Sequence, residues 1–73
     1  MSNKLIETLG DALPKEMARV RDVLMPLYQS IGVPGVPALT MMRMSLDNAA
    51  MAMASGDVVA MLRAYEDLKG YTA

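Results

Sequence analysis

The 73-residue sequence contains no cysteine, no histidine, no tryptophan and no phenylalanine. Without cysteine, the chain has neither disulfide bonds nor thiolate chemistry. Without histidine, it lacks the usual proton carrier near neutral pH and the commonest metal ligand. A chain of this length forms one domain at most, and its core alone rarely supplies more than roughly 3–5 kcal/mol of net stability. Oligomerisation or very efficient helix packing is therefore the expected source of further stability.

The charges do not cluster by sign either. Seven basic and eight acidic residues give a formal charge of −1, and no run of Lys and Arg occurs. A protein that holds nucleic acid through phosphate contacts normally shows clustered basic residues. The three tyrosines are the only aromatic residues on which bases could stack. The sequence therefore predicts that nucleic acid is an unlikely partner.

The longest uncharged segment runs from Val23 to Met42, and its twenty residues match the length of a membrane span. It also contains Pro26, Pro34 and Pro37 together with Gly32 and Gly35. In lipid, such breaks would leave backbone groups without hydrogen bonds, so we predict no membrane partner. The N-terminus has no apolar core of a signal peptide, and the predicted localisation is cytoplasmic.

The spacing of apolar residues predicts an all-α protein, a small helical bundle or array of three main helices plus a short N-terminal helix. The predicted helices cover residues 2–9, 13–31, 37–55 and 57–69. Glycines are placed to end them, and Asp57 is the predicted cap of the last one. No segment has the pattern of a strand, so residues 1–73 are predicted to form a single helical domain.

The second predicted helix carries one apolar stripe with intervals of 4, 3, 4, 3 and 4 residues. The stripe consists of Leu13, Met17, Val20, Leu24, Leu27 and Ile31. Pro26 interrupts this helix, because its ring strains the preceding turn and the carbonyl of Asp22 loses its donor. We therefore expect a kink near Met25, or two helices in succession.

Methionine is concentrated in the third predicted helix, which holds five of the nine methionines between positions 41 and 53. On a helical wheel with about 100° per residue, one apolar face forms from Leu39, Met42, Leu46, Ala49, Ala50 and Met53. Met44 and Met51 fall on the other side, among polar residues, where a small monomer would have little reason to be apolar.

Three interpretations of Met44 and Met51 are open. Neighbouring helices could cover them as ordinary core, a symmetry-related copy could cover them, or a different protein could do so. Methionine is flexible and polarizable, which suits irregular partners. We predict a protein-binding surface made of Met41, Met44, Asn48 and Met51. A homo-oligomer, with a dimer favoured, is the expected assembly, and another protein is the alternative partner.

Catalytic constellations are absent from the sequence. Glu66 and Asp67 are adjacent, so they point to different sides of a helix and do not form a pair of catalytic carboxylates. No phosphate-binding loop, dinucleotide fingerprint, or calcium or zinc ligand spacing occurs. Three charged pairs at helical spacing are predicted to be ordinary exposed ion pairs: Arg43 with Asp47, Arg63 with Asp67, and Arg19 with Asp22. The sequence thus predicts no enzymatic activity, no catalytic residues, no cofactor and no metal site.

Two segments, LIETLGDALPKEMARVRDVLMPLYQSIGVPG and GDVVAMLRAYEDLKGY, resemble small proteins of unassigned function encoded in proteobacterial genomes and their prophages. The resemblance covers most of the chain. It implies a cytoplasmic, phage-related protein and no particular catalytic or binding residues. Small acidic phage proteins often occupy the surface of a host protein, so the resemblance favours a protein-binding role.

The sequence as a whole predicts a methionine-rich helical protein that binds protein, above all a copy of itself, rather than transforming a substrate. Two alternatives come from other classes: a dimeric nucleic-acid-associated regulator and a structural subunit of a larger particle. Clustering of Arg19, Arg21 and Arg63 on one face of the assembly would favour the regulator.

Overall fold

Four α-helices and two short turns of other helical types make up the described chain. The computed structural model describes residues 2–73, and the side chains of residues 8–73. The elements are α1 (Ser2–Arg19), the π-turn η1 (Val20–Leu24), α2 (Met25–Ser30), the 3-10 turn η2 (Val33–Gly35), α3 (Val36–Ser55) and α4 (Val58–Lys69). No strand occurs within residues 2–73, which confirms the all-α prediction.

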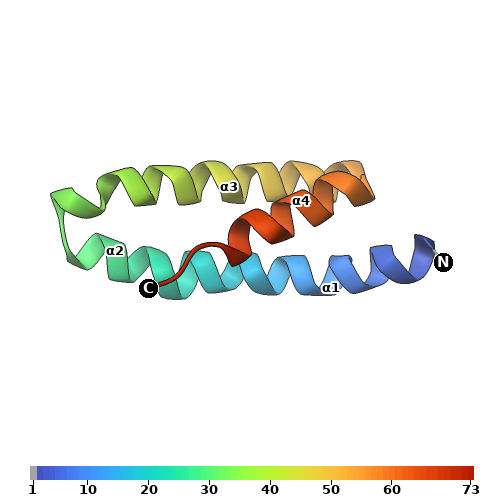
Figure 1. Ribbon diagram of the computed structural model, residues 1–73, viewed down its shortest axis with the longest axis horizontal. Coiled ribbons are helices and arrows are strands. Elements are labelled where there is room, and N and C mark those ends of the chain that lie inside the picture. Colours follow the sequence, from blue (N-terminus) through green and yellow to red (C-terminus); the bar gives the residue numbers. More distant parts are fainter. Residues whose placement is uncertain (1) are drawn as a thin grey trace.

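The molecule is elongated, with extents of 44 × 16 × 16 Å, and consists of a helical hairpin to which α4 is added. Figure 1 shows α1 and α2 following each other along one long side, α3 running back along the other, and α4 crossing obliquely between them. The core lies where these helices meet. Its most deeply buried apolar side chains are Leu13, Val20, Met42, Ala49 and Leu68.

A continuous α1 replaces the predicted separate helix over residues 2–9 and its end at Gly10. Leu9 and Leu13 are four residues apart and both buried, and an uninterrupted helix places both on the side that faces the core. Gly10 is exposed, and its cost of about 1 kcal/mol in a helix is small beside the burial of two leucines. Pro14 lies inside α1 and has no N–H to donate to the carbonyl of Gly10. Because Gly10 is exposed, water can donate to that carbonyl instead.

The helical hydrogen-bond pattern changes just before Pro26, where the sequence predicts a kink. Over Val20–Leu24 the backbone forms a π-turn, and the N–H of Met25 donates to the carbonyl of Val20. α2 begins at Met25, so Pro26 falls in its first turn, where a missing N–H costs little. The change from α to π pattern therefore accommodates the proline between two helical segments.

The π-turn also rotates the apolar stripe that follows it. One extra residue in a turn shifts all later side chains by about 100° around the helix. Met25 is buried and Tyr28 half-buried, whereas Leu27 and Ile31 are 48% and 55% exposed. The predicted stripe is thus correct as far as Leu24 and wrong beyond it, because hydrophobic periodicity does not reveal a π-turn.

Two glycines shape the connection between α2 and α3. Gly32 has a φ of +76°, a left-handed conformation that favours glycine. Gly35 is buried against α2, and a Cβ there would overlap the backbone carbonyl oxygen of Tyr28. α3 then begins at Val36 with Pro37 in its first turn, within one residue of the predicted start.

Gly56 and Asp57 join α3 to α4 as the sequence predicts. Gly56 has a φ of +68°, and its N–H donates to the carbonyl of Ala52 at 3.1 Å. The carboxylate of Asp57 accepts hydrogen bonds from the backbone N–H groups of Val59 at 3.0 Å and Ala60 at 3.3 Å. A cap of this kind stabilises a helix by about 1 kcal/mol. The short joint directs α4 back along α3.

Hydrogen bonds from α1 and α3 hold the C-terminal end of α4 in place. The guanidinium of Arg19 donates to the carbonyl of Leu68 at 3.0 Å, to that of Tyr71 at 3.1 Å, and to Glu16 at 2.6 Å. The hydroxyl groups of Tyr71 and the buried Ser45 are 2.8 Å apart and hydrogen-bonded. Together with the burial of Met61 and Leu68, these contacts fix α4 against one side of α3.

Candidate protein-interaction surface

The two sides of α3 have opposite surroundings. Met42 is 1% exposed, and Met53 packs half-buried against the same core. Met41, Met44 and Met51 are 59%, 62% and 63% exposed. The other helices therefore cover only one side of α3. For a single chain, the interpretation of Met44 and Met51 as ordinary core is wrong.

The predicted surface residues share one exposed side of α3, which we call the methionine seam: Met41, Met44, Asn48 and Met51. Their intervals are 3, 4 and 3 residues, and Ser55 continues the series after four more. Alternating intervals of three and four keep side chains on one side of a helix, as in the contact line of a coiled coil. All four residues are exposed, so the seam is open to solvent along its length.

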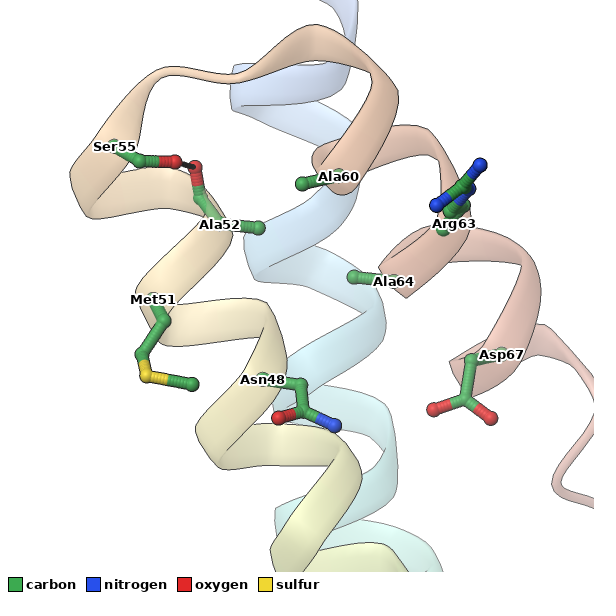
Figure 2. Close-up of a pocket in the computed structure, with 8 residues that line it drawn as sticks. All are labelled: Asn48, Met51, Ala52, Ser55, Ala60, Arg63, Ala64 and Asp67. Atoms are coloured by element: carbon green, nitrogen blue, oxygen red, sulfur yellow. Dashed lines mark hydrogen bonds between the residues drawn. The ribbon is translucent and has the colours of Figure 1, made fainter.

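A groove of about 650 Å³ lies between the seam and α4. Asn48, Met51 and Ser55 line it from α3, and Arg63 and Asp67 line it from α4 (Figure 2). Between these walls, Figure 2 shows three alanine side chains that point into the space between the helices: Ala52, Ala60 and Ala64. Because alanine is short, another helix laid in this groove could approach the two backbones closely.

Four charged residues flank the seam without forming ion pairs in the described chain: Arg43, Asp47, Arg63 and Asp67. The ion pairs within 4 Å join other residues, namely Lys15 with Asp11, Arg19 with Glu16, and Arg21 with Asp22. The predicted helix pairs Arg43–Asp47 and Arg63–Asp67 are therefore wrong for the single chain. In both, the arginine precedes the aspartate, which is the weaker orientation for a helical ion pair.

The predicted pair of Arg19 with Asp22 does not form either, because both residues have other partners. Arg19 is drawn to the end of α4, as described above. Asp22 accepts hydrogen bonds from the exposed Arg21 at 2.9 and 3.2 Å. The hydrogen bond from Arg21, aided by its positive charge, lowers the pKa of Asp22, and the same contact raises the pKa of Arg21. This pair is exposed and lies some twenty residues before the seam in sequence.

A second exposed apolar region lies at the hairpin end. Its most exposed side chains are Leu27, Ile31, Val33 and Val36. A smaller groove of about 320 Å³ at this end is lined by Leu27, Tyr28, Ser30, Ile31 and Ala73. The region has no regular residue spacing and no charged group in its groove. It gives no indication of what would bind there, so the seam is the better-defined candidate.

The described residues offer little to other kinds of site. Among them, no three or more Asp, Glu, His or Cys side chains are grouped so that they could hold a metal ion. In the same part of the chain, none of the helices has both the length and the apolarity to cross a membrane. The hydroxyl pair of Ser45 and Tyr71 is part of the packing that holds α4.

Comparison with known proteins identified no relative of this chain. No family model matches the chain, and neither a curated protein nor a solved structure is significantly similar to it. The resemblance to small proteobacterial and prophage proteins therefore stays a prediction. Any function has to be argued from the seam and the groove.

The sequence did not point to the α4 wall of the groove, which Arg63 and Asp67 form. One signal was available: Ala60 and Ala64 are small residues four apart on one side of a helix. The side of α4 that borders the seam depends, however, on how the buried Met61, Ala64 and Leu68 pack α4 against the core.

Proposed function

We propose that the protein is a non-enzymatic, self-associating helical protein, and that the methionine seam with its neighbouring groove binds a second copy. The observation that carries this proposal is the exposure of Met41, Met44 and Met51 at regular helical spacing beside a groove floored by alanines. A large apolar side chain repeated along one exposed line of a helix is typical of a helix-binding surface.

Several features of the seam favour a copy of the chain over an unrelated protein. A seam at intervals of three and four residues binds best to another helix with the same spacing, and α3 of a second copy has it. Pairing of identical surfaces gives the two-fold symmetric dimer that is commonest among soluble oligomers. Methionine is also enriched at the centres of protein interfaces relative to the rest of the surface.

The apolar area in the seam suits a dimer of modest affinity. Full burial of one methionine stabilises by about 1.5–3 kcal/mol, and more than half of each seam methionine is still exposed. The six methionines of a dimer would then contribute about 5–11 kcal/mol. Association itself costs about 4–15 kcal/mol. We therefore expect a dissociation constant in the micromolar range or weaker, with the alanine groove and the flanking charges adding to the methionines.

The basic residues speak against the alternative of a nucleic-acid-associated regulator. Arg19 is engaged by Glu16 and two backbone carbonyls, and Arg21 by Asp22. Neither guanidinium is free to join Arg63 in a basic patch for phosphate groups. As the setting for self-association we propose the cytoplasm, which is the compartment that the resemblance to prophage proteins implies.

Sedimentation or light scattering between about 1 and 500 µM tests the proposal. We expect the wild-type mass to rise from monomer to dimer across this range. The variant Met44→Glu/Met51→Glu should stay folded and remain monomeric, because it places charges in the seam. The matched control is Val59→Glu/Leu62→Glu, which changes two exposed apolar residues of α4 outside the groove and should still dimerise.

The outcomes separate the alternatives. A wild-type protein that is monomeric at the highest concentration overturns self-association and leaves a different protein as the partner of the seam. A dimer that persists in the seam variant would place the interface elsewhere on the surface. A particle larger than a dimer that persists on dilution would favour the structural-subunit alternative.

A further inference from the structure

The charged residues on the two sides of the seam favour one orientation of two copies over the other. Arg63 and Asp67 line the groove on one side of the seam (Figure 2). Helical geometry of about 100° per residue puts Arg43 and Asp47 on the other side, away from the groove. None of the four has an ion-pair partner in the described chain. Each flank carries one positive and one negative group, so one flank could pair with the other only across an interface between copies.

Symmetry decides whether the two flanks meet. Two copies that pair seam to seam are related by a two-fold axis that runs either across α3 or along it. An axis across α3 at the middle of the seam makes the two α3 helices antiparallel and sets Asp47 beside Asp47 of the second copy, where like charges repel. An axis along α3 makes the helices parallel and carries α4 of the second copy over to Arg43 and Asp47. Only the parallel arrangement places the Arg43–Asp47 flank opposite the α4 wall of the other copy.

The order of the charges along the helix axis matches this arrangement. α4 runs antiparallel to α3 along the groove (Figure 2). From the start of α3 onward, one flank therefore carries Arg43 and then Asp47, while the α4 wall carries Asp67 and then Arg63. A two-fold axis along α3 leaves the position of each residue along that axis unchanged. Arg43 therefore faces Asp67 of the other copy, and Asp47 faces Arg63 of the other copy.

Asn48 fits the same arrangement. With a two-fold axis along α3, Asn48 of one copy faces Asn48 of the other at the centre of the seam, with Met44 and Met51 each facing their own counterparts. In parallel helix pairs, a single asparagine in the apolar contact line sets the register and the two-stranded state. The exposed Asn48 amide has no partner in the described chain, and an amide can both donate to and accept from its symmetry mate.

We infer that the seam binds a second copy of this chain in parallel orientation, about a two-fold axis along α3. Asn48 meets Asn48, Arg43 pairs with Asp67 of the second copy, and Asp47 pairs with Arg63 of the second copy. The inference rests on the proposed self-association and adds its geometry. Each dimer then contains four intermolecular ion pairs that no single chain can form.

Mixing two charge-reversal variants tests this geometry. Asp47→Arg alone and Arg63→Asp alone should each weaken homodimerisation by about tenfold, because like charges then face each other. In a mixture, a copy with Asp47→Arg and a copy with Arg63→Asp restore both contacts. The heterodimer should therefore exceed the two homodimers by about tenfold in native mass spectrometry of differently tagged chains. Asp47 and Arg63 lie on opposite flanks of one chain, so the gain can arise only between copies.

Disulfide formation gives an independent measure of orientation, since the natural chain has no cysteine. Chains with Met41→Cys and differently tagged chains with Ser55→Cys are mixed and oxidised mildly. A parallel pair joins like positions and yields homodisulfides, whereas an antiparallel pair joins residue 41 to residue 55. Ala50→Cys, on the side of α3 away from the seam, is the control and should not cross-link.

The results distinguish a wrong geometry from a wrong function. If the seam variant Met44→Glu/Met51→Glu abolishes a real dimer but mixing gives no excess of heterodimer, the parallel geometry is overturned and self-association stands. A mixed disulfide between positions 41 and 55 overturns it as well. If the wild-type chain is monomeric at every concentration, the proposed function itself fails.

Discussion

The inward and outward sides of α3 carry similar residues, but those on the inward side are buried and those on the outward side are exposed to solvent. Met42 is buried in the core, and Met44, two residues later, projects from the opposite side. The inward polar residue, Ser45, is buried and hydrogen-bonded to Tyr71, whereas the outward one, Asn48, has no partner in the described chain. Folding of one chain therefore leaves three large methionines of α3 exposed. These three lie along a single line, which an interface between helices requires.

The largest expected difference is between two alanine substitutions. Met42→Ala removes a fully buried side chain and should lower the free energy of unfolding by about 2–5 kcal/mol, enough to unfold much of so small a protein. Met44→Ala should change it by less than about 0.5 kcal/mol in dilute solution, where the chain is monomeric. Urea unfolding followed by circular dichroism measures both. Equal losses would contradict the division of α3 into a folding side and a binding side.

A smaller effect is expected from the polar residue of the seam. Asn48→Leu should tighten association by about tenfold, close to 1.4 kcal/mol, because it replaces a polar contact by an apolar one. It should also broaden the distribution of oligomers, because the asparagine no longer sets the register. Sedimentation velocity detects both changes. Gln29→Leu, which alters an exposed amide on α2, is the control; if it broadens the distribution equally, the asparagine has no special role.

The smallest effect is expected at the exposed pair of Arg21 and Asp22, which belongs to neither side of α3. The pKa of Asp22 is lowered in the folded state, so its contribution is complete above the ordinary aspartate pKa of about 4. It is lost as the pH falls through the lowered folded-state pKa. Asp22→Asn should remove this small acid dependence and leave dimerisation unchanged. The pH dependence of thermal unfolding between about pH 2 and 7 measures it. A large change in dimer affinity would show that the interface extends to η1.

Local signals in the sequence were sufficient for much of the fold. Gly56 and Asp57 end one helix and begin the next as predicted, because left-handed glycine and a capping carboxylate act within a few residues. The start of α3 near Pro37 follows from the same local chemistry. Gly10 was misleading for a related reason: its preference for helix ends is weaker than the burial of Leu9 and Leu13 on either side of it.

Features that depend on distant contacts or on a changed helical period could not be predicted from local sequence signals. The π-turn before Pro26 shifted the stripe by one residue and left Leu27 and Ile31 exposed. Arg19 was predicted to pair within its own helix, yet it contacts Tyr71, 52 residues away. No periodicity argument includes such a partner, because the partner is set by the path of the chain in space.

For the candidate site, the sequence by itself determined that Met41, Met44, Asn48 and Met51 share one side of a helix, since helical spacing follows from backbone geometry alone. Only the tertiary structure decided that this side stays uncovered, that α4 borders it with Arg63 and Asp67, and that the flanking charges lack partners. The physical reason is that burial and pairing depend on where a neighbouring helix lies. That position is set by the joint at Gly56, by the burial of Met61 and Leu68 in the core, and by the hydrogen bonds at the far end of α4.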